Sequence, residues 1–285
     1  MHFLGIDAGA SATKWVLINE NGPVSSGVLE AMDGHLYRES SLERMRKVLR
    51  EISAKTKNVE VTSVYMGITG VTHDGSIQKE IHAVFGCPST VISDIELAYR
   101  ANFADGEGIL LYAGTGSVAY AIDENGSVHQ IGGWGYLLGD EGAGYWIGRE
   151  AIRVALYKIE AKEGINQDSL AGQVLEKINA HDWSTVKSFV YSQDRSAIAA
   201  LSKIVDTAAS AGDSDAIEIL SKAAGHLAEL VSRADRQLVR KALPVKFTGG
   251  ISGSKSLYFE LEKFLRIRVT ISTADIALRA AELAR

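Results

Sequence analysis

The strongest constraint on the fold of this chain is a pattern that occurs twice. An apolar run at 3–6 is followed by a loop of small residues, a second apolar run at 15–18 and the turn Glu20-Asn21-Gly22. Residues 108–126 repeat this order and end in Glu124-Asn125-Gly126. Asn-Gly between apolar runs favours a hairpin, because both residues tolerate positive φ. The pattern predicts an internal duplication of one strand–loop–strand–turn unit, although such hairpins are common enough to recur by coincidence.

The rest of the chain alternates between helical and strand-like patterns. Apolar residues at three- and four-residue spacing predict helices over 41–55 and about 214–239. Further strands are predicted at 64–68, 90–92, 245–248 and 267–271, and further helices after residue 94, around 254–265 and at the C-terminal end. Strands separated by helices indicate an α/β fold with a mixed sheet in each of two lobes.

Composition limits the classes of partner. The chain has 285 residues, of which 46% are hydrophobic, so it can bury a large core. A net charge of -5 leaves no basic surplus for binding nucleic acid or an anionic membrane. We expect no signal peptide and no transmembrane span. The single cysteine, Cys87, excludes an internal disulfide and a cysteine-held cluster within one chain, and is typical of a cytoplasmic protein.

Three glycine-bearing loops each follow a short apolar strand. They are Asp7–Lys14, Gly114–Ser117 and Thr248–Gly253. Glycine lets backbone N–H groups approach phosphate oxygens, because no Cβ blocks the way. A single loop of this kind is usually only a turn, but three in this order favour a phosphate chain. The motifs of Rossmann and P-loop nucleotide sites do not occur in the right context.

The loops that join strand to strand resemble those of the actin, hexokinase and Hsp70-like superfamily. The block Gly132–Ile147, GGWGYLLGDEGAGYWI, is similar to the signature of N-acetylglucosamine kinases within the BadF/BadG/BcrA/BcrD ATPase family. Asp7-Ala8-Gly9, Ser93-Asp94, Gly114–Ser117 and Gly249-Gly250 extend this resemblance over almost the whole chain.

The resemblance implies a two-lobed α/β fold of the actin-like ATPase (ribonuclease H-like) type, with duplicated mixed sheets flanked by helices and a cleft between the lobes. We expect an N-terminal actin-like ATPase domain at residues 1–104 and a C-terminal one at 105–285. The last helix is expected to be able to pack back on the N-terminal lobe. The two lobes would close over both substrates and exclude water.

The resemblance also assigns roles to residues. It makes Asp94 the catalytic base that accepts the proton of the acceptor hydroxyl, and Asp7 the carboxylate that orients Mg²⁺ through water. The residues expected to bind ATP and its phosphates are Asp7, Gly9, Ser11, Thr13, Lys14, Gly114, Thr115, Gly116, Gly249, Gly250 and Ser252. The residues expected to bind the sugar are Asp94, Gly133, Trp134 and Asp140.

Each of these assignments has a purely structural alternative. Asp94 precedes a predicted helix and could serve only as its cap, and Asp7 could form an Asx turn. Asp140 and Glu141 could be ordinary acids of a first helical turn. Trp146 fits core packing better than a sugar platform. Lys14 could be only a solvated strand residue.

One departure from the family concerns the acceptor. Family members often carry an Asn that contacts the sugar after the third strand, where this chain reads Met32-Asp33-Gly34-His35. Asp33 or His35 could take its place. The exact sugar is therefore open among N-acetylglucosamine, glucosamine, N-acetylmuramic acid and another hexose.

The sequence therefore predicts an ATP- and Mg²⁺-dependent kinase of amino-sugar metabolism, which transfers the γ-phosphate to a hydroxyl, O6, of a sugar such as N-acetylglucosamine. Homodimerisation is expected from the resemblance. One alternative is an ATPase activator of a radical dehydratase, but its iron–sulfur cluster needs four thiolates and a dimer of this chain supplies two. A sugar-sensing repressor would need an N-terminal DNA-binding module, whereas the first predicted strand begins at residue 3.

Overall fold

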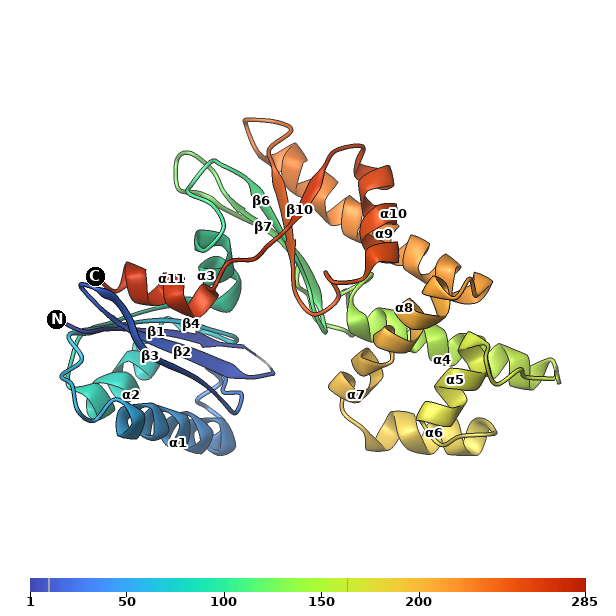
Figure 1. Cartoon of the computed structure of the whole chain (residues 1–285), viewed down its shortest axis with the longest axis horizontal. Coiled ribbons are helices and arrows are strands. Elements are labelled where there is room, and N and C mark those ends of the chain that lie inside the picture. Colours follow the sequence, from blue (N-terminus) through green and yellow to red (C-terminus); the bar gives the residue numbers. More distant parts are fainter. Residues whose placement is uncertain (10, 163) are drawn as a thin grey trace. The chain divides into compact units, whose positions relative to one another are not determined.

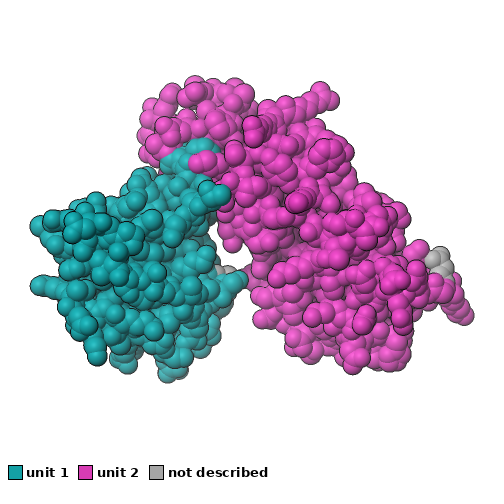
Figure 2. All heavy atoms as spheres, in the orientation of Figure 1, with its two compact units in different colours: residues 1–103, 273–285 teal, residues 104–272 magenta. Residues whose placement is uncertain are grey.

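The computed structural model describes residues 1–9, 11–162 and 164–285. Its contacts divide the chain into two compact units, which Figure 2 colours separately. Unit 1 comprises Met1–Phe103 together with Thr273–Arg285, and unit 2 comprises Ala104–Ser272. The last 13 residues of the chain therefore belong to the same unit as its first residues.

Unit 1 is built on a five-stranded mixed sheet in the order β3-β2-β1-β4-β5 (Figure 1). Its strands are β1 (Phe3–Ala8), β2 (Thr13–Asn19), β3 (Gly22–Leu29), β4 (Ser63–Ile68) and β5 (Ser89–Ser93). β1 pairs antiparallel with β2 and parallel with β4, and β5 runs parallel to β4. Asn19 pairs with Gly22 across a two-residue turn, so the first predicted hairpin is confirmed.

Helices cover both faces of this sheet. They are α1 (Glu39–Lys55), α2 (Ser76–Phe85), α3 (Asp94–Arg100) and α11 (Ile276–Leu283). Alternate residues of β1 point to opposite faces: Leu4 and Ile6 join the core formed with α1 and α2, and Phe3 joins a smaller cluster with α11. Gly5 lies on the α11 face, where a Cβ would stand 2.2 Å from the carbonyl oxygen of Ala277. The missing side chain lets the helix backbone approach the strand closely.

Unit 2 repeats the sheet of unit 1. Its strands are β6 (Ile109–Ala113), β7 (Ser117–Ile122), β8 (Val128–Gly132), β9 (Val245–Thr248) and β10 (Val269–Ile271). The order β8-β7-β6-β9-β10 matches β3-β2-β1-β4-β5, with two antiparallel pairings followed by two parallel ones. The predicted duplication and the α/β class are confirmed. The second turn is longer than the first, because Ile122 pairs with Val128.

The helices of unit 2 follow β8 along the chain, and the last of them lies between β9 and β10. They are α4 (Gly144–Glu160), α5 (Leu170–Lys177), α6 (Trp183–Ser192), α7 (Arg195–Ala200), α8 (Ser202–Ser210), α9 (Ser214–Gln237) and α10 (Lys255–Leu265). α9 packs on β6, β7 and β8, and α10 packs on α9. The Asp213 side chain caps α9 by accepting from Ala216 N–H at 2.9 Å. Within the described part of the chain, no helix is both long and apolar enough to cross a membrane.

Candidate active site

Three parallel strands of unit 1 end in register, and two predicted site residues lie at this edge. Ala8 of β1 pairs with Ile68 of β4, and Ile68 pairs with Ser93 of β5. Asp7 is the penultimate residue of β1, and Asp94 directly follows β5. The carboxyl edge of a parallel sheet is where ligands bind in open α/β folds.

The carboxyl group of Asp7 is perturbed by its surroundings. Burial, opposed by the charge of Lys14 and reinforced by the charges of Asp94 and Asp275, raises its pKa to about 6. No hydrogen bond to the Asp7 carboxylate is found among the described residues. An ionised Asp7 would therefore be stabilised by a cation.

Magnesium fits these surroundings when it is held largely through water. Mg²⁺ prefers carboxylate and phosphate oxygens and keeps several of its waters. The described residues contain no group of three or more His, Cys, Asp or Glu side chains that could cage a metal directly. Asp7, with Asp94 and Asp275 close enough to raise its pKa, supplies the anionic oxygens that such an ion needs.

Asp94 is the first residue of α3 but does not cap it. Ser93 is the N-cap, and its Oγ accepts from Glu96 N–H at 3.2 Å. One oxygen of Asp94 accepts from Ile95 N–H at 2.9 Å, and burial raises the pKa of this carboxyl group above its ordinary value. The capping alternative therefore applies to Ser93. A partly buried carboxylate remains at the sheet edge, as a general base requires.

The first glycine loop places its predicted residues on different sides of the strands. Gly9 N–H donates to the carbonyl of Ala12 at 3.1 Å, and Ser11 and Lys14 are exposed. Lys14 pairs with Asp7 across β1 and β2. Thr13 is fully buried on the other face of β2, and its Oγ1 has no hydrogen-bond partner among the described residues. Contact of the Thr13 side chain with a phosphate stays a prediction.

In unit 2 the second and third glycine loops lie against each other. Gly114–Gly116 follows β6 and Gly249-Gly250 follows β9, whose last residue pairs with Tyr112. Ile251 N–H donates to the carbonyl of Ala113 at 3.2 Å. A Cβ on Gly249 would stand 2.3 Å from that same oxygen, so only glycine allows this approach. Two of the three predicted phosphate loops therefore meet at one edge of the unit 2 sheet.

The side chain of Asp140 packs against the second glycine loop, Gly114–Ser117. Its carboxylate accepts from Ser117 N–H at 3.3 Å, and a Cβ on Gly116 would stand 2.5 Å from it. Burial raises the pKa of Asp140, whereas the Ser117 N–H and the charge of Arg195 lower it. Ser117 Oγ also donates to the carbonyl of Glu141 at 3.0 Å. Asp140 thus fixes the Thr115-Gly116 turn, and its predicted contact with the sugar stays a prediction.

The remaining predicted residues of unit 2 lie near these loops. Gly133 N–H donates to the carbonyl of Ser117 at 3.0 Å. Trp134 is exposed, and the guanidinium of Arg233 lies 5.3 Å from its ring centroid. Ser252 Oγ donates to the carbonyl of Gly249 at 2.9 Å, which closes the third loop on itself. Trp146 is buried in the core, as expected.

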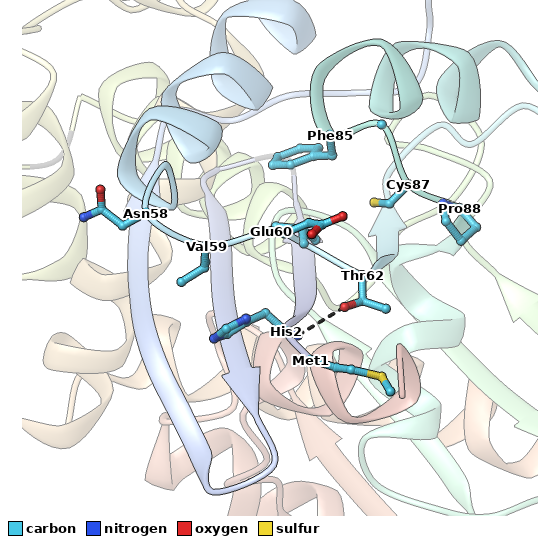
Figure 3. Close-up of a pocket in the computed structure, with 11 residues that line it drawn as sticks. Met1, His2, Asn58, Val59, Glu60, Thr62, Phe85, Cys87 and Pro88 are labelled. Carbon is cyan, nitrogen blue, oxygen red and sulfur yellow. Dashed lines mark hydrogen bonds between the residues drawn. The ribbon is translucent and has the colours of Figure 1, made fainter.

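A hollow of about 640 Å³ in unit 1 lies away from the predicted site. The residues that precede β1, β4 and β5 line it, so it opens at the amino edge of the parallel strands (Figure 3). Backbone N–H of His2 donates to Thr62 Oγ1 there at 3.2 Å. Cys87 lies in the same wall, and burial raises the pKa of its thiol. Its thiol is therefore unsuited to act as a thiolate ligand.

Comparison with known proteins decides the family. The model of the BadF/BadG/BcrA/BcrD ATPase family matches residues 4–279. The chain belongs to this family. It is 29% identical to an N-acetylmuramic acid/N-acetylglucosamine kinase of Clostridium acetobutylicum, with 100% of this chain and 98% of the relative covered. It is 26% identical to an N-acetyl-D-glucosamine kinase of Dictyostelium discoideum, over 99% of this chain and 97% of that protein.

Solved structures share the fold of this BadF/BadG/BcrA/BcrD family member. One is a Chromobacterium violaceum protein described as a candidate N-acetylglucosamine kinase, with a TM-score of 0.80 and 23% identity over 100% of this chain and 99% of that one. A ROK family glucokinase of Streptomyces griseus, solved with glucose and AMPPNP, has a TM-score of 0.62 and 16% identity over 100% and 99% of the two chains. At these identities the similarity concerns the fold.

Two residues of unit 1 were not among the predicted site residues. Asp275 caps α11 by accepting from Leu278 N–H at 3.0 Å, and its charge raises the pKa of Asp7. In sequence it is indistinguishable from any other helix cap. His35 was considered only as a substitute for the family's Asn, and the structure shows it hydrogen-bonded to Asp33 at 3.0 Å.

Proposed function

We propose that this BadF/BadG/BcrA/BcrD family member is an ATP-dependent kinase that transfers the γ-phosphate to O6 of an amino sugar, N-acetylglucosamine or N-acetylmuramic acid. The observation that carries this proposal is the pair of partly buried carboxylates, Asp7 and Asp94, at one edge of the unit 1 sheet. Two full-length relatives that bear the names of kinases for these acceptors support it. The cytoplasmic location and the homodimer stay predictions.

In unit 1, Asp94 acts on the acceptor. Its carboxylate takes the proton of the sugar hydroxyl as the oxygen attacks, and the hydrogen bond from Ile95 N–H fixes its orientation. Asp7 would help to hold the magnesium ion that accompanies the nucleotide. Phosphoryl transfer needs alignment and charge stabilisation more than covalent chemistry, so two fixed carboxylates are an adequate set.

In unit 2, backbone amides act on phosphate oxygens. The Thr115-Gly116 turn, held by Asp140 and Ser117, would offer its backbone N–H groups, and Gly116 adds no side chain there. Gly249 and Gly250 do the same from the third loop. ATP supplies the γ-phosphoryl group, with Mg²⁺ neutralising part of its charge, and the loops of unit 2 hold the triphosphate during transfer.

The test is release of ADP across a panel of acceptors. We expect N-acetylglucosamine and N-acetylmuramic acid to stimulate ADP release far above a control without sugar, and glucosamine and glucose to stimulate it less. Two-dimensional ³¹P–¹H NMR of the product should couple phosphorus to the protons on C6. If no sugar raises ADP release above the control, the kinase proposal is wrong. If phosphorus couples to another position, only the assignment to O6 is wrong.

A further inference from the structure

Helix α11 runs along one face of the unit 1 sheet, with its C-terminal end at the amino edge of the parallel strands. There Ser63 Oγ donates to the carbonyl of Ala284, and the side chain of Arg285 donates to the carbonyl of Asn19. Ser63 begins β4, and Asn19 ends β2, which is antiparallel to β1. The first residues of α11 therefore lie toward the carboxyl edge, where Asp7 lies.

The contact between α11 and β1 brings the start of the helix toward Asp7. Gly5 and Asp7 lie on the same face of β1, because side chains two residues apart in a strand point the same way. A Cβ on Gly5 would stand 2.2 Å from the carbonyl oxygen of Ala277. Asp275 precedes Ala277 by two residues, and Asp7 follows Gly5 by two. Both carboxylates therefore lie on the carboxyl-edge side of this contact.

The exposed side chain of Asp275 has one carboxylate oxygen free for a ligand. Its Oδ1 accepts from Leu278 N–H at 3.0 Å and caps α11. The other oxygen has no hydrogen bond or ion pair among the described residues. Arg279, one turn further along α11, donates instead to the carbonyl of Arg100 and to Glu282. No basic side chain of its own helix therefore neutralises Asp275.

The charges around Asp7 are mainly negative. Those of Asp94 and Asp275 raise the pKa of Asp7, and only that of Lys14 lowers it. A divalent cation replaces the repulsion between neighbouring carboxylates with attraction to both. In nucleotide sites Mg²⁺ is usually bound by one or two carboxylates together with phosphate oxygens. Because Asp94 is assigned to the acceptor, Asp275 is the carboxylate available beside Asp7.

We propose that Asp275 is a second carboxylate of the magnesium site: its free oxygen helps Asp7 to hold the ion that accompanies the nucleotide, while its capping oxygen fixes it at the start of α11. The inference rests on the proposed kinase function and deepens it. The metal site of unit 1 is then assembled from both ends of the chain, because Asp7 belongs to the first strand and Asp275 to the last helix.

The experiment measures binding of AMPPNP by isothermal titration calorimetry, with Mg²⁺ and with EDTA in its place. For the wild-type protein we expect Mg²⁺ to tighten binding. Asp275→Asn removes the charge but keeps the cap, because Asn caps helices as well as Asp does. In that variant the Kd with Mg²⁺ should rise about tenfold, and the Kd in EDTA should not rise. In an Asp7→Asn background the same change should matter less, because the two carboxylates then share no ion.

Asp182→Asn is the matched control. Asp182 caps α6 in unit 2 by accepting from Thr185 N–H at 2.8 Å, so its replacement makes the same change of charge at another helix cap. Both dissociation constants should stay at their wild-type values. If Asp275→Asn does not fold, Asp275→Ser replaces it with the same expectations, because Ser also caps helices.

The outcomes separate the two proposals. If Asp275→Asn binds AMPPNP with Mg²⁺ as tightly as the wild type does, Asp275 is only a cap and the inference is wrong, while the kinase stands. An equal loss of affinity with Mg²⁺ and with EDTA would also overturn it, because that result indicates a structural role. The same holds if Mg²⁺ does not tighten binding to the wild type. If the wild type binds no AMPPNP under either condition, both proposals fall.

Discussion

At the scale of the residue, Ser93 caps α3, although the sequence also allowed Asp94 to be only the cap of that helix. Ser93 satisfies the free N–H of Glu96 at the start of α3. Asp94 is thereby released from capping, and its carboxylate stays partly buried at the sheet edge. A serine cap followed by an acidic residue thus places a carboxylate where a helix begins without weakening the helix.

Asp94→Asn tests this assignment. The amide has the shape of the carboxylate but cannot take a proton, so we expect sugar-dependent ADP release to fall by about a hundredfold or more. The KM for ATP and the unfolding temperature should change little. Glu96→Gln is the matched control in the same helix, where it removes only the 2.9 Å pair with Arg100 and should retain activity. Full activity in Asp94→Asn would refute the role of the base.

Because of Asp7, the free energy of unfolding depends on pH, and burial of its carboxyl group sets the direction of this dependence. Its pKa rises from 3.8 in the unfolded chain to about 6 in the fold, so the stabilising protonated form is lost as pH rises through this range. Asp7→Asn removes the free-energy cost of burying an ionised carboxylate. We expect the nucleotide-free variant to be about 1–2 kcal/mol more stable than the wild type near pH 7.5, with the difference vanishing near pH 4.

Thermal unfolding over that pH range measures the effect, and Glu43→Gln, which replaces an exposed acid of α1 in the same unit, serves as control. Adding Mg²⁺ and ATP should reverse the order, because the wild-type carboxylate then gains a cation that the amide cannot hold. Equal unfolding temperatures for the two proteins at both ends of the range would contradict the perturbed pKa.

Asp7 and Asp94 could be predicted from the sequence, whereas site residues that are brought together only by tertiary contacts could not. The resemblance to the family assigned Asp7 and Asp94, and in the fold Asp7 is the penultimate residue of β1 and Asp94 follows β5. The proximity of Asp275 to Asp7 arises only when α11 packs on β1. The hydrogen bonds of Asp33 with His35 and Ser41 likewise could not be predicted from spacing.

At the scale of the element, the contact of β1 with α11 leaves no room for a side chain. In Gly5→Ala the new Cβ would stand 2.2 Å from both the Ala277 oxygen and the Ala281 nitrogen, and these are backbone atoms that cannot turn aside. We expect a loss of about 2 kcal/mol or more in the free energy of unfolding. Chemical denaturation measures it. Gly164→Ala, where nothing lies within 4 Å, is the control and should be neutral.

The elements found from sequence are those with strong apolar periodicity. The helix predicted over 41–55 is α1, whose buried residues Met45, Val48, Leu49 and Ile52 keep the expected spacing. α2 was not predicted, because it buries only Ile77 and Ile81 and leaves a short pattern. The strand expected at 267–271 is confirmed only for 269–271. Short elements depend on their neighbours more than on local pattern.

At the scale of the whole molecule, the chain begins and ends in one unit. Removing residues 273–285 would expose Phe3, Val16 and Ile18, which α11 covers. We expect unit 1 of such a truncated chain to unfold at a clearly lower temperature while unit 2 keeps its own transition. Calorimetry, with limited proteolysis to assign each transition, measures this. Unchanged unfolding of unit 1 would show that α11 is dispensable.

The duplicated architecture could be predicted because the pattern occurs twice in the sequence, and the resemblance to the family allowed the last helix to pack on the N-terminal lobe, as α11 does. This return of α11 to unit 1 has a consequence for synthesis on the ribosome. Unit 1 is translated first, yet one face of its sheet stays bare until α11 has been made, whereas every residue of unit 2 precedes α11 along the chain. The later half of the molecule can therefore mature before the earlier half.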